Sequence, residues 1–237
     1  MNKLTKALLI IVTSFAFANY ASAVSFSAGV AGNLQVYAGK GVEHNGGTTG
    51  NNLQEANGAF DSSHVAIFLE GDVTDMVTIG LEYAPEAIES PENINAQQTG
   101  ATDANPSGGT VVTNKASVEY EDITTLYANI GLPVIEGSYL KVGYISMDVI
   151  TTESLGTGGA YPDTDIDGYT IGLGYNRDLN DGAFVRLEAN YIDLDGATLK
   201  NSNDSTNLAT NSIQNATLWR KICRLCDRRK SHQSRHY

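Results

Sequence analysis

Residues 168–175 read GYTIGLGY, and residues 183–191 read AFVRLEANY. In the first stretch large apolar or aromatic side chains alternate with Gly and Thr, and in the second apolar residues alternate with a mostly polar set. A period of two is typical of a β-strand with two different faces. Residues 176–182, NRDLNDG, lie between the two stretches and are rich in turn formers. The sequence therefore predicts a β-hairpin over residues 167–191.

The polarity of this hairpin leaves two orientations open. Tyr169 and Tyr175 bound one face, whereas Arg186 and Glu188 lie on the other. In a soluble barrel the apolar face points inward, and in a membrane barrel it points to the lipid while charged residues face the lumen. The two tyrosines are separated by roughly 20 Å along a strand, which suits two aromatic girdles around a hydrocarbon band about 25 Å tall. The rest of the chain has to decide between the two orientations.

The N-terminal residues have the form of a secretory signal. Two lysines give a positive start, residues 7–18 are mostly apolar, and Ala21-Ser22-Ala23 has the small-x-small form that signal peptidase cleaves. The apolar run is too short to span a membrane as a helix. We expect a signal peptide over residues 1–23 and a mature chain that starts near Val24. The alternative is a buried N-terminal helix.

The composition after this signal narrows the class of protein. Residues 24–218 carry 6 basic and 26 acidic side chains and no cysteine. Nucleic acid is therefore excluded as a partner, and no disulfide framework holds the segment. No apolar run after Val24 is long enough for a membrane helix. The chain is either a soluble exported β-protein or an outer-membrane barrel, because only helices and closed barrels satisfy their backbone polar groups in lipid.

Seven stretches with a period of two follow one another, and the connections between them alternate in length. The first covers residues 24–38, longer than a usual soluble strand. The others are expected near residues 65–70, 77–83, 118–132, 140–144, 168–175 and 183–191. Long polar segments follow the first, third, fifth and seventh strands, at residues 39–62, 85–116, 149–166 and 193–214. A transmembrane barrel has short periplasmic turns and long external loops, so this alternation favours the membrane orientation.

Together with the signal peptide, three motifs carry a family resemblance: VSFSAGVAG at residues 24–32, GDVTDMVTIGLEY at residues 71–83, and YTIGLGYNRDLNDGAFVRLEANY at residues 169–191. Over residues 24–218 the chain resembles the OmpA/OmpX-like barrels, the small eight-stranded outer-membrane β-barrel family of Gram-negative bacteria. The resemblance implies an all-β fold: an antiparallel eight-stranded transmembrane up-and-down β-barrel with short periplasmic turns and long external loops. It is specific for architecture and weak for activity.

The resemblance also implies a monomer in the outer membrane, in contact with lipid and lipopolysaccharide and inserted by the barrel assembly machinery. Its lumen would be filled by side chains or narrowly open. Five lumen charges would pair with one another: Glu70, Glu82, Lys141, Arg186 and Glu188. The alternative for these five is a solvated strand face. Five tyrosines would form the aromatic girdle: Tyr83, Tyr144, Tyr169, Tyr175 and Tyr191.

Residues 219–237 depart from this pattern. They hold seven of the fifteen basic residues, both cysteines and the only tryptophan. An eighth strand is needed here because seven would leave an open edge in lipid, yet no apolar alternation precedes Tyr237. We interpret the shift as a changed reading frame near residues 215–219. The alternatives are a basic tail that binds anionic lipid and a zinc site, whose ligand pairs lie closer together than in a finger: Cys223, Cys226, His232 and His236.

Two further motifs carry less weight. Residues 163–168, DTDIDG, match the start of a calcium loop, but Gly174 stands where an EF-hand needs Glu. A weaker interpretation is a cation site at the outer rim that bridges lipopolysaccharide phosphates, with Asp193 and Asp195 nearby. A barrel hydrolase could use His44 or His64, the latter beside two serines, Ser62 and Ser63, but no spacing singles out a triad.

We therefore expect no enzyme activity and no catalytic, cofactor-binding or metal-binding residues. The expected role is envelope-structural or that of a narrow porin-like passage, since an eight-stranded interior is only wide enough for side chains or one small ligand. The alternatives are an adhesion or binding module that acts through acidic external loops and, less favoured, an outer-membrane barrel hydrolase.

Overall fold

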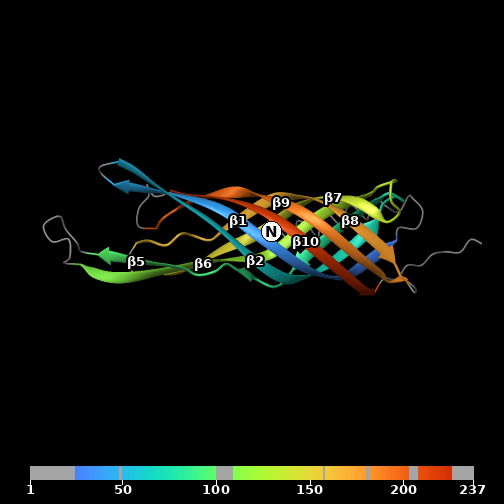
Figure 1. The fold of residues 1–237 in the computed structure, drawn as a ribbon, viewed down its shortest axis with the longest axis horizontal. Coiled ribbons are helices and arrows are strands. Elements are labelled where there is room, and N and C mark those ends of the chain that lie inside the picture. The colour runs from blue at the N-terminus through green and yellow to red at the C-terminus, as the bar shows by residue number, and fades with distance from the viewer. Residues whose placement is uncertain are drawn as a thin grey trace, which may run out of the picture.

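The computed structural model describes residues 25–47, 50–99, 109–156, 158–179, 182–202 and 208–225. For residues 43–47, 50–54, 97–99 and 208–225 the description covers the backbone alone. Nearly all of the described chain is β-structure (Figure 1). No helix in these segments is long and apolar enough to cross a membrane.

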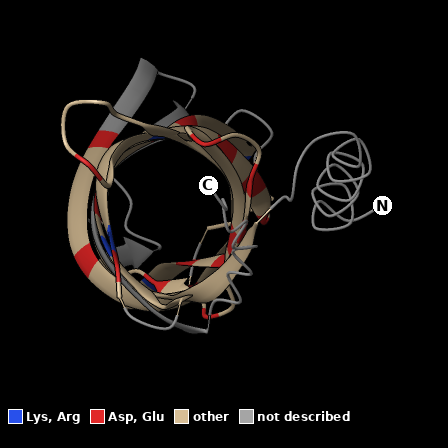
Figure 2. Ribbon diagram, turned by 90° about the vertical axis from the view of Figure 1, so that its right-hand side faces the viewer, with Lys and Arg blue, Asp and Glu red and all other residues tan. Residues whose placement is uncertain are grey.

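Eight strands form a closed wall: β1 (Phe26–Gly47), β2 (Gly50–Asp72), β3 (Val77–Ala84), β6 (Thr110–Gly131), β7 (Ser138–Ser154), β8 (Thr164–Asp178), β9 (Phe184–Lys200) and β10 (Leu208–Leu225). Each pairs antiparallel with its neighbours in chain order, and the ring closes because β1 pairs with β10. Two short strands, β4 (Ile88–Glu89) and β5 (Asn93–Thr99), pair with β6 beyond the end of β3. The end-on view shows the ring (Figure 2). The predicted eight-stranded up-and-down barrel is confirmed.

The three short turns lie at one end of the barrel, as the sequence predicted. They join β2 to β3, β6 to β7 and β8 to β9. In the first, the Thr74 hydroxyl oxygen accepts hydrogen bonds from the backbone N–H groups of Met76 and Val77, at 3.2 and 3.0 Å. In the second, Gly137 has a φ of 83°, a conformation that favours glycine. This end is the periplasmic one, because short turns face the periplasm in such barrels.

The long connections lie at the external end, but much of each is strand rather than loop. β1 and β2 pair without a break through residues 39–62 up to Gly47 and Gly50. β6 begins at Thr110 and β7 reaches Ser154, inside segments that the sequence had indicated as loops. Polar side chains do not prevent this, because the ladder uses backbone groups and both faces of an external hairpin can be hydrated. The β1–β2 and β5–β6 hairpins extend past the barrel as two separate arms (Figure 1).

The last strand differs most from the prediction. The polar segment expected at residues 193–214 is mostly strand, since β9 runs to Lys200 and β10 begins at Leu208. β10 also crosses the boundary expected at residue 218, and its register with β1 pairs Leu218 with Leu34 and Trp219 with Asn33. The signal peptide and three of the four zinc candidates, Cys226, His232 and His236, lie outside the described residues. The changed reading frame stays a hypothesis.

The apolar faces of the strands point outward and the mostly polar faces point into the lumen, as in a membrane barrel. On β8, Tyr169, Ile171 and Leu173 are 66%, 52% and 60% exposed, whereas Thr170 between them is 6% exposed. β1 and β2 behave in the same way, with Leu34 and Ile67 on the outside. An exposed apolar band around a mostly polar interior is the inverse of a soluble barrel, and it suits a lipid surrounding.

Glycines on the inner face make room for large lumen side chains. Gly174 lies directly across from Tyr139, and Gly80 lies directly across from Tyr127. A Cβ atom at either glycine would overlap the facing tyrosine ring. Because an eight-stranded lumen is narrow, each ring lies across the neighbouring strand where that strand has no side chain. The face of small residues in 168–175 thus leaves space in the lumen for an aromatic ring of the neighbouring strand, that of Tyr139 at Gly174.

Candidate functional site

β9 has a lumen-facing residue at every second position and shows how the interior changes along the barrel axis. From the periplasmic end outward these residues, each at most 6% exposed, are Phe184, Arg186, Glu188, Asn190, Ile192 and Leu194. The lumen therefore passes from a charged layer through an amide layer to an apolar layer.

Arg186 and Glu70 form the central ion pair of the charged layer. The guanidinium donates from Nη2 to Glu70 Oε2 at 2.9 Å and from Nη1 to Glu70 Oε1. Glu70 Oε1 also accepts from the Tyr127 hydroxyl at 2.7 Å and from Asn129 Nδ2 at 3.2 Å. The guanidinium carbon lies 4.9 to 5.7 Å from the centres of three aromatic rings, those of Phe184, Tyr139 and Phe68. Both charges are thus held in a bidentate, buried arrangement.

Lys141 joins the two remaining carboxylates to this pair. Its Nζ donates to Glu188 Oε2 at 3.1 Å and lies 3.7 Å from Glu82 Oε2. Glu188 Oε1 accepts from the Tyr139 hydroxyl and lies 3.9 Å from Arg186 Nη1. The structure therefore brings all five lumen charges of the sequence analysis into one network. None of these side chains is more than 7% exposed, so the network fills the lumen rather than lining an open channel.

Two further layers close the lumen toward the external end. In the amide layer, Asn33 Nδ2 lies 2.8 Å from His64 Nε2. Beyond it, seven inward side chains form an apolar layer: Ile88, Ile123, Ile145, Met147, Ile166, Ile192 and Leu194. The rings of Tyr37, Phe60 and Tyr120 stack above this layer, with centres 4.9 to 6.4 Å apart. Sequence reasoning missed the apolar layer, although the inward parity of β7 continues through Ile145, Met147 and Val149 and could have indicated it.

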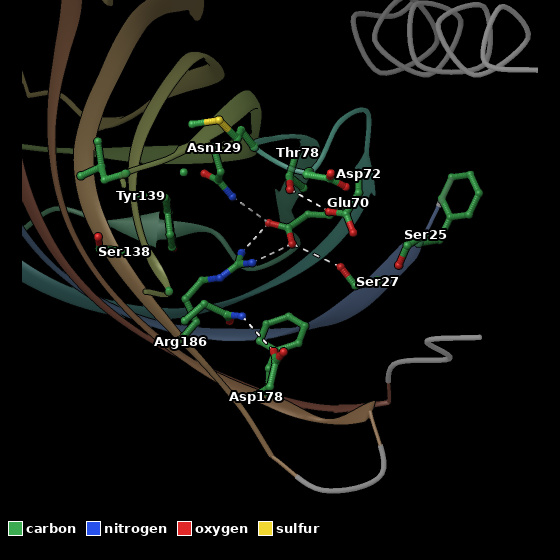
Figure 3. A pocket seen from close by; sticks show the side chains of 18 of the residues that line it. Ser25, Ser27, Glu70, Asp72, Thr78, Asn129, Ser138, Tyr139, Asp178 and Arg186 are labelled. Carbon is green, nitrogen blue, oxygen red and sulfur yellow. Dashed lines mark hydrogen bonds and ion pairs between the residues drawn. The ribbon is translucent and has the colours of Figure 1, made fainter. Parts of the chain in front are cut away.

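At the periplasmic end the charge network borders a cavity of about 480 Å³, which we call the periplasmic vestibule (Figure 3). Glu70 and Arg186 lie at its inner end, and the Ser27 hydroxyl donates to Glu70 Oε2 at 3.3 Å. Two more carboxylates in its wall accept hydrogen bonds: Asp72 from the Thr78 hydroxyl at 2.7 Å, and Asp178 from Asn176 Nδ2 at 3.2 Å. No sequence motif had indicated this cavity, because its wall combines residues of three turns with the periplasmic ends of several strands.

The girdle tyrosines lie on the outer surface. Tyr144 and Tyr169 face each other across β7 and β8, with ring centres 5.9 Å apart and an angle of 70° between the rings. Tyr175 lies at the periplasmic end of the exposed face of β8, opposite Ser138. Tyr191 is exposed opposite Ile171, and the half-buried Tyr83 donates its hydroxyl to Asp122 Oδ1 at 2.7 Å. Tyr169 and Tyr175 thus bound the exposed apolar face of β8, as a girdle requires.

The residues considered for a hydrolase are not brought together. His64 is 5% exposed in the lumen, whereas its neighbour Ser63 is exposed on the opposite face of β2. Only the backbone of His44 is described, within β1. The carboxylate of Asp163 accepts a hydrogen bond from the backbone N–H of Thr151 at 2.9 Å. Within the described segments no three His, Cys, Asp or Glu side chains lie close enough to hold a metal ion.

Comparison with known proteins finds solved structures with a similar fold but little sequence identity to this chain. No protein-family model matches the chain, and no curated protein matches it. Among solved structures, the outer membrane protease OmpT from Escherichia coli is 8% identical over 86% of this chain and 99% of its own, with a TM-score of 0.47. Outer membrane protein AlkL is 13% identical over 85% and 90%, with a TM-score of 0.46. Neisserial surface protein A is 9% identical over 83% and 99%, with a TM-score of 0.32.

The architecture itself defines the class. A closed antiparallel eight-stranded barrel with an exposed apolar outside and a buried charged inside is an outer-membrane β-barrel. The chain is therefore an outer-membrane β-barrel protein of the cell envelope, with short periplasmic turns and long external hairpins. The narrower resemblance to the OmpA/OmpX-like barrels stays a prediction.

Proposed function

We propose that this protein is a closed barrel with an envelope-structural role, in preference to the narrow porin-like passage. The observation that carries the proposal is the filled lumen, since no inward side chain of β9 from Phe184 to Leu194 is more than 6% exposed. A water-filled passage exposes the side chains that line it. The proposal keeps the surroundings expected from the sequence: a monomer among outer-membrane lipid and lipopolysaccharide, inserted by the barrel assembly machinery and without enzyme activity.

The layered interior supports this proposal physically. A solute that crossed the lumen would have to separate the ion pairs of Arg186 and Lys141 and then pass the apolar layer. Leaving a buried charge without its partner is costly, and an ion in the apolar layer would lose its hydration without gaining hydrogen bonds. Both barriers lie in series along the same narrow axis.

Conductance in a planar bilayer tests the proposal. The full protein, shown to be folded by its fast mobility on unheated gels, is expected to give no current steps above those of the bare bilayer. A general porin inserted into the same bilayer is the positive control. Stable, ohmic steps from the folded protein would contradict the closed-barrel proposal and restore the porin-like role.

A second candidate function, adhesion or binding through the external hairpins, is favoured by the arms beyond the barrel. Besides these arms, the external part of the barrel wall carries exposed carboxylates on β4, on β6, at the start of β8 and on β9: Glu89, Asp122, Asp163, Asp165, Asp193 and Asp195. Burial raises the pKa of Glu153, and a hydrogen bond from the backbone N–H of Tyr161 opposes this shift. The exposed carboxylates create a negative field at the external end. Such a field attracts basic surfaces.

Vesicles that carry the protein with its external end outward are expected to attach to polylysine-coated beads. Changing the six exposed carboxylates to amides is expected to reduce attachment several-fold in low salt, because the attraction is screened only weakly there. A variant that loses Asp75 alone, at the periplasmic end, is the matched control and should attach as the unchanged protein does. Equal attachment by all three proteins would contradict the adhesion proposal.

A further inference from the structure

The periplasmic vestibule has a strongly acidic lining. Its charged residues are Glu70, Asp72, Asp75 and Asp178 against the single cation Arg186. Arg186 is already engaged, because Glu70 binds it in a bidentate manner and Glu188 lies 3.9 Å away. Among the described residues no basic side chain forms an ion pair with Asp72 or Asp75. The cavity therefore has negative charge that its own wall does not compensate.

The neutral polar groups of the vestibule wall are also acceptors. Asn129 is 5% exposed and donates its Nδ2 to Glu70, which leaves its Oδ1 without a donor among the described residues (Figure 3). Asn176 likewise donates its Nδ2 to Asp178 and has no donor at its Oδ1 in the described chain. The hydroxyls of Ser27 and Thr78 are already used as donors to carboxylates. The site thus offers oxygen acceptors and few free donors.

These features select the chemistry of a ligand. A bare metal ion is disfavoured, because the described residues include no group of three ligands close enough to bind one. The carboxylates come instead from the end of β2, the turn that follows it and the end of β8, around a cavity of about 480 Å³. An organic cation that donates several hydrogen bonds suits these acceptors, since charge-assisted hydrogen bonds to carboxylates are the strong ones. We propose that the periplasmic vestibule binds a primary ammonium group.

Two sources could supply this ammonium group. One is a lysine-like amine on another molecule in the periplasm. The other is the chain itself, because the Ser25 carbonyl oxygen at the wall accepts from the Asp72 backbone N–H at 2.9 Å. Cleavage after Ala23, as the sequence predicts, would create an α-ammonium one residue before Ser25. Consecutive Cα atoms lie about 3.8 Å apart, and Ser25, the residue next to this new terminus, lines the vestibule.

Binding of a probe amine tests the proposal on protein purified from outer membranes, which has its natural N-terminus. The probe is Nα-acetyl-lysine N-methylamide, which carries one ammonium group, and the readout is the shift of the Thr78 and Asn129 backbone amide signals in NMR spectra. The uncharged norleucine analogue is the control ligand and is expected not to bind. The protein is measured untreated and after selective acetylation of its α-amine, which has a lower pKa than lysine.

Asp72→Asn/Asp178→Asn is expected to weaken binding of the probe at least about tenfold, because each carboxylate is lost as an acceptor for a charged donor. Asp163→Asn/Asp165→Asn removes the same charge at the external end and should leave binding unchanged. Binding only after acetylation identifies the chain's own α-ammonium as the occupant, and binding before and after identifies an external amine; both support the proposal. No saturable shift in either state, or equal binding by the vestibule variant, would overturn it.

Discussion

A chain without β10, made by deleting residues 208–237, is expected to lose the barrel completely. It should migrate identically with and without heating and should not fractionate with the outer membrane. The reason is that β10 pairs with β1 at 15 register positions and with β9 at 14. Every backbone group left unpaired in lipid costs several kcal/mol, so even a few exceed the roughly 5–15 kcal/mol by which a folded protein is stable.

The remaining strands cannot repair this loss by pairing directly. In the up-and-down order β1 and β9 run in the same direction, because each is antiparallel to β10. A direct β1–β9 contact would therefore be a parallel pair. The seven strands that remain would also need a new tilt and a new stagger to close the ring.

Deletion of residues 226–237 alone is the matched control. It leaves β10 intact, so heat-modifiable mobility and outer-membrane fractionation should both be retained. If this shorter deletion abolished the barrel as well, a strand that ends at Leu225 would not be sufficient for closure. If the chain without β10 still gave a fast-migrating form, the closure of the barrel by β10 would be wrong.

Arg186→Met is expected to produce the largest destabilisation of any single substitution in the lumen. It leaves Glu70 buried at 1% exposure without its bidentate partner and brings Glu188 next to an apolar side chain. Removing one partner of a buried ion pair costs about 3–5 kcal/mol. The measurement is the urea concentration at which the unheated fast-migrating form disappears, for the protein refolded into lipid vesicles.

Two comparison variants separate charge from packing. Arg177→Met removes a basic residue that is exposed at the periplasmic end of β8, and its urea midpoint should barely move, because exposed substitutions usually change stability by about 0.5 kcal/mol or less. Glu70→Gln/Arg186→Met removes both charges of the pair and should recover part of the loss, as a double-mutant cycle would reveal. An Arg186→Met midpoint equal to that of Arg177→Met would show that the pair contributes nothing to stability.

Much of the architecture could be predicted from alternation and turn spacing. Alternation between tyrosine or aliphatic residues and glycine in residues 168–175 predicted both the strand and its two faces, because the side-chain period of a strand is fixed by its backbone geometry. The position of the three short turns predicted which end is periplasmic. Parity also assigned five charged residues to one face, and the structure places them together in the lumen: Glu70, Glu82, Lys141, Arg186 and Glu188.

The extent of the strands could not be predicted in the same way. Polar, glycine-rich residues in 39–62 gave a loop signal, yet they form a paired hairpin because backbone hydrogen bonds hold an external ladder whatever its side chains are. The eighth strand was expected near residues 219–237, but the start of β10 at Leu208 was not predicted, for a related reason. Its residues lack the apolar alternation that a strand prediction needs. Its strand conformation depends instead on backbone pairing with β1 on one side and β9 on the other.

The sequence by itself determined the class of the protein: an exported, acidic chain whose alternating strands and short turns make an outer-membrane barrel. Only the tertiary structure decided that Arg186 binds Glu70 while Lys141 binds Glu188, that an apolar layer lies beyond the charged one, and that three turns line an acidic vestibule. The physical reason is that alternation along a strand is local, whereas partners across the lumen depend on the register, tilt and closure of all eight strands together.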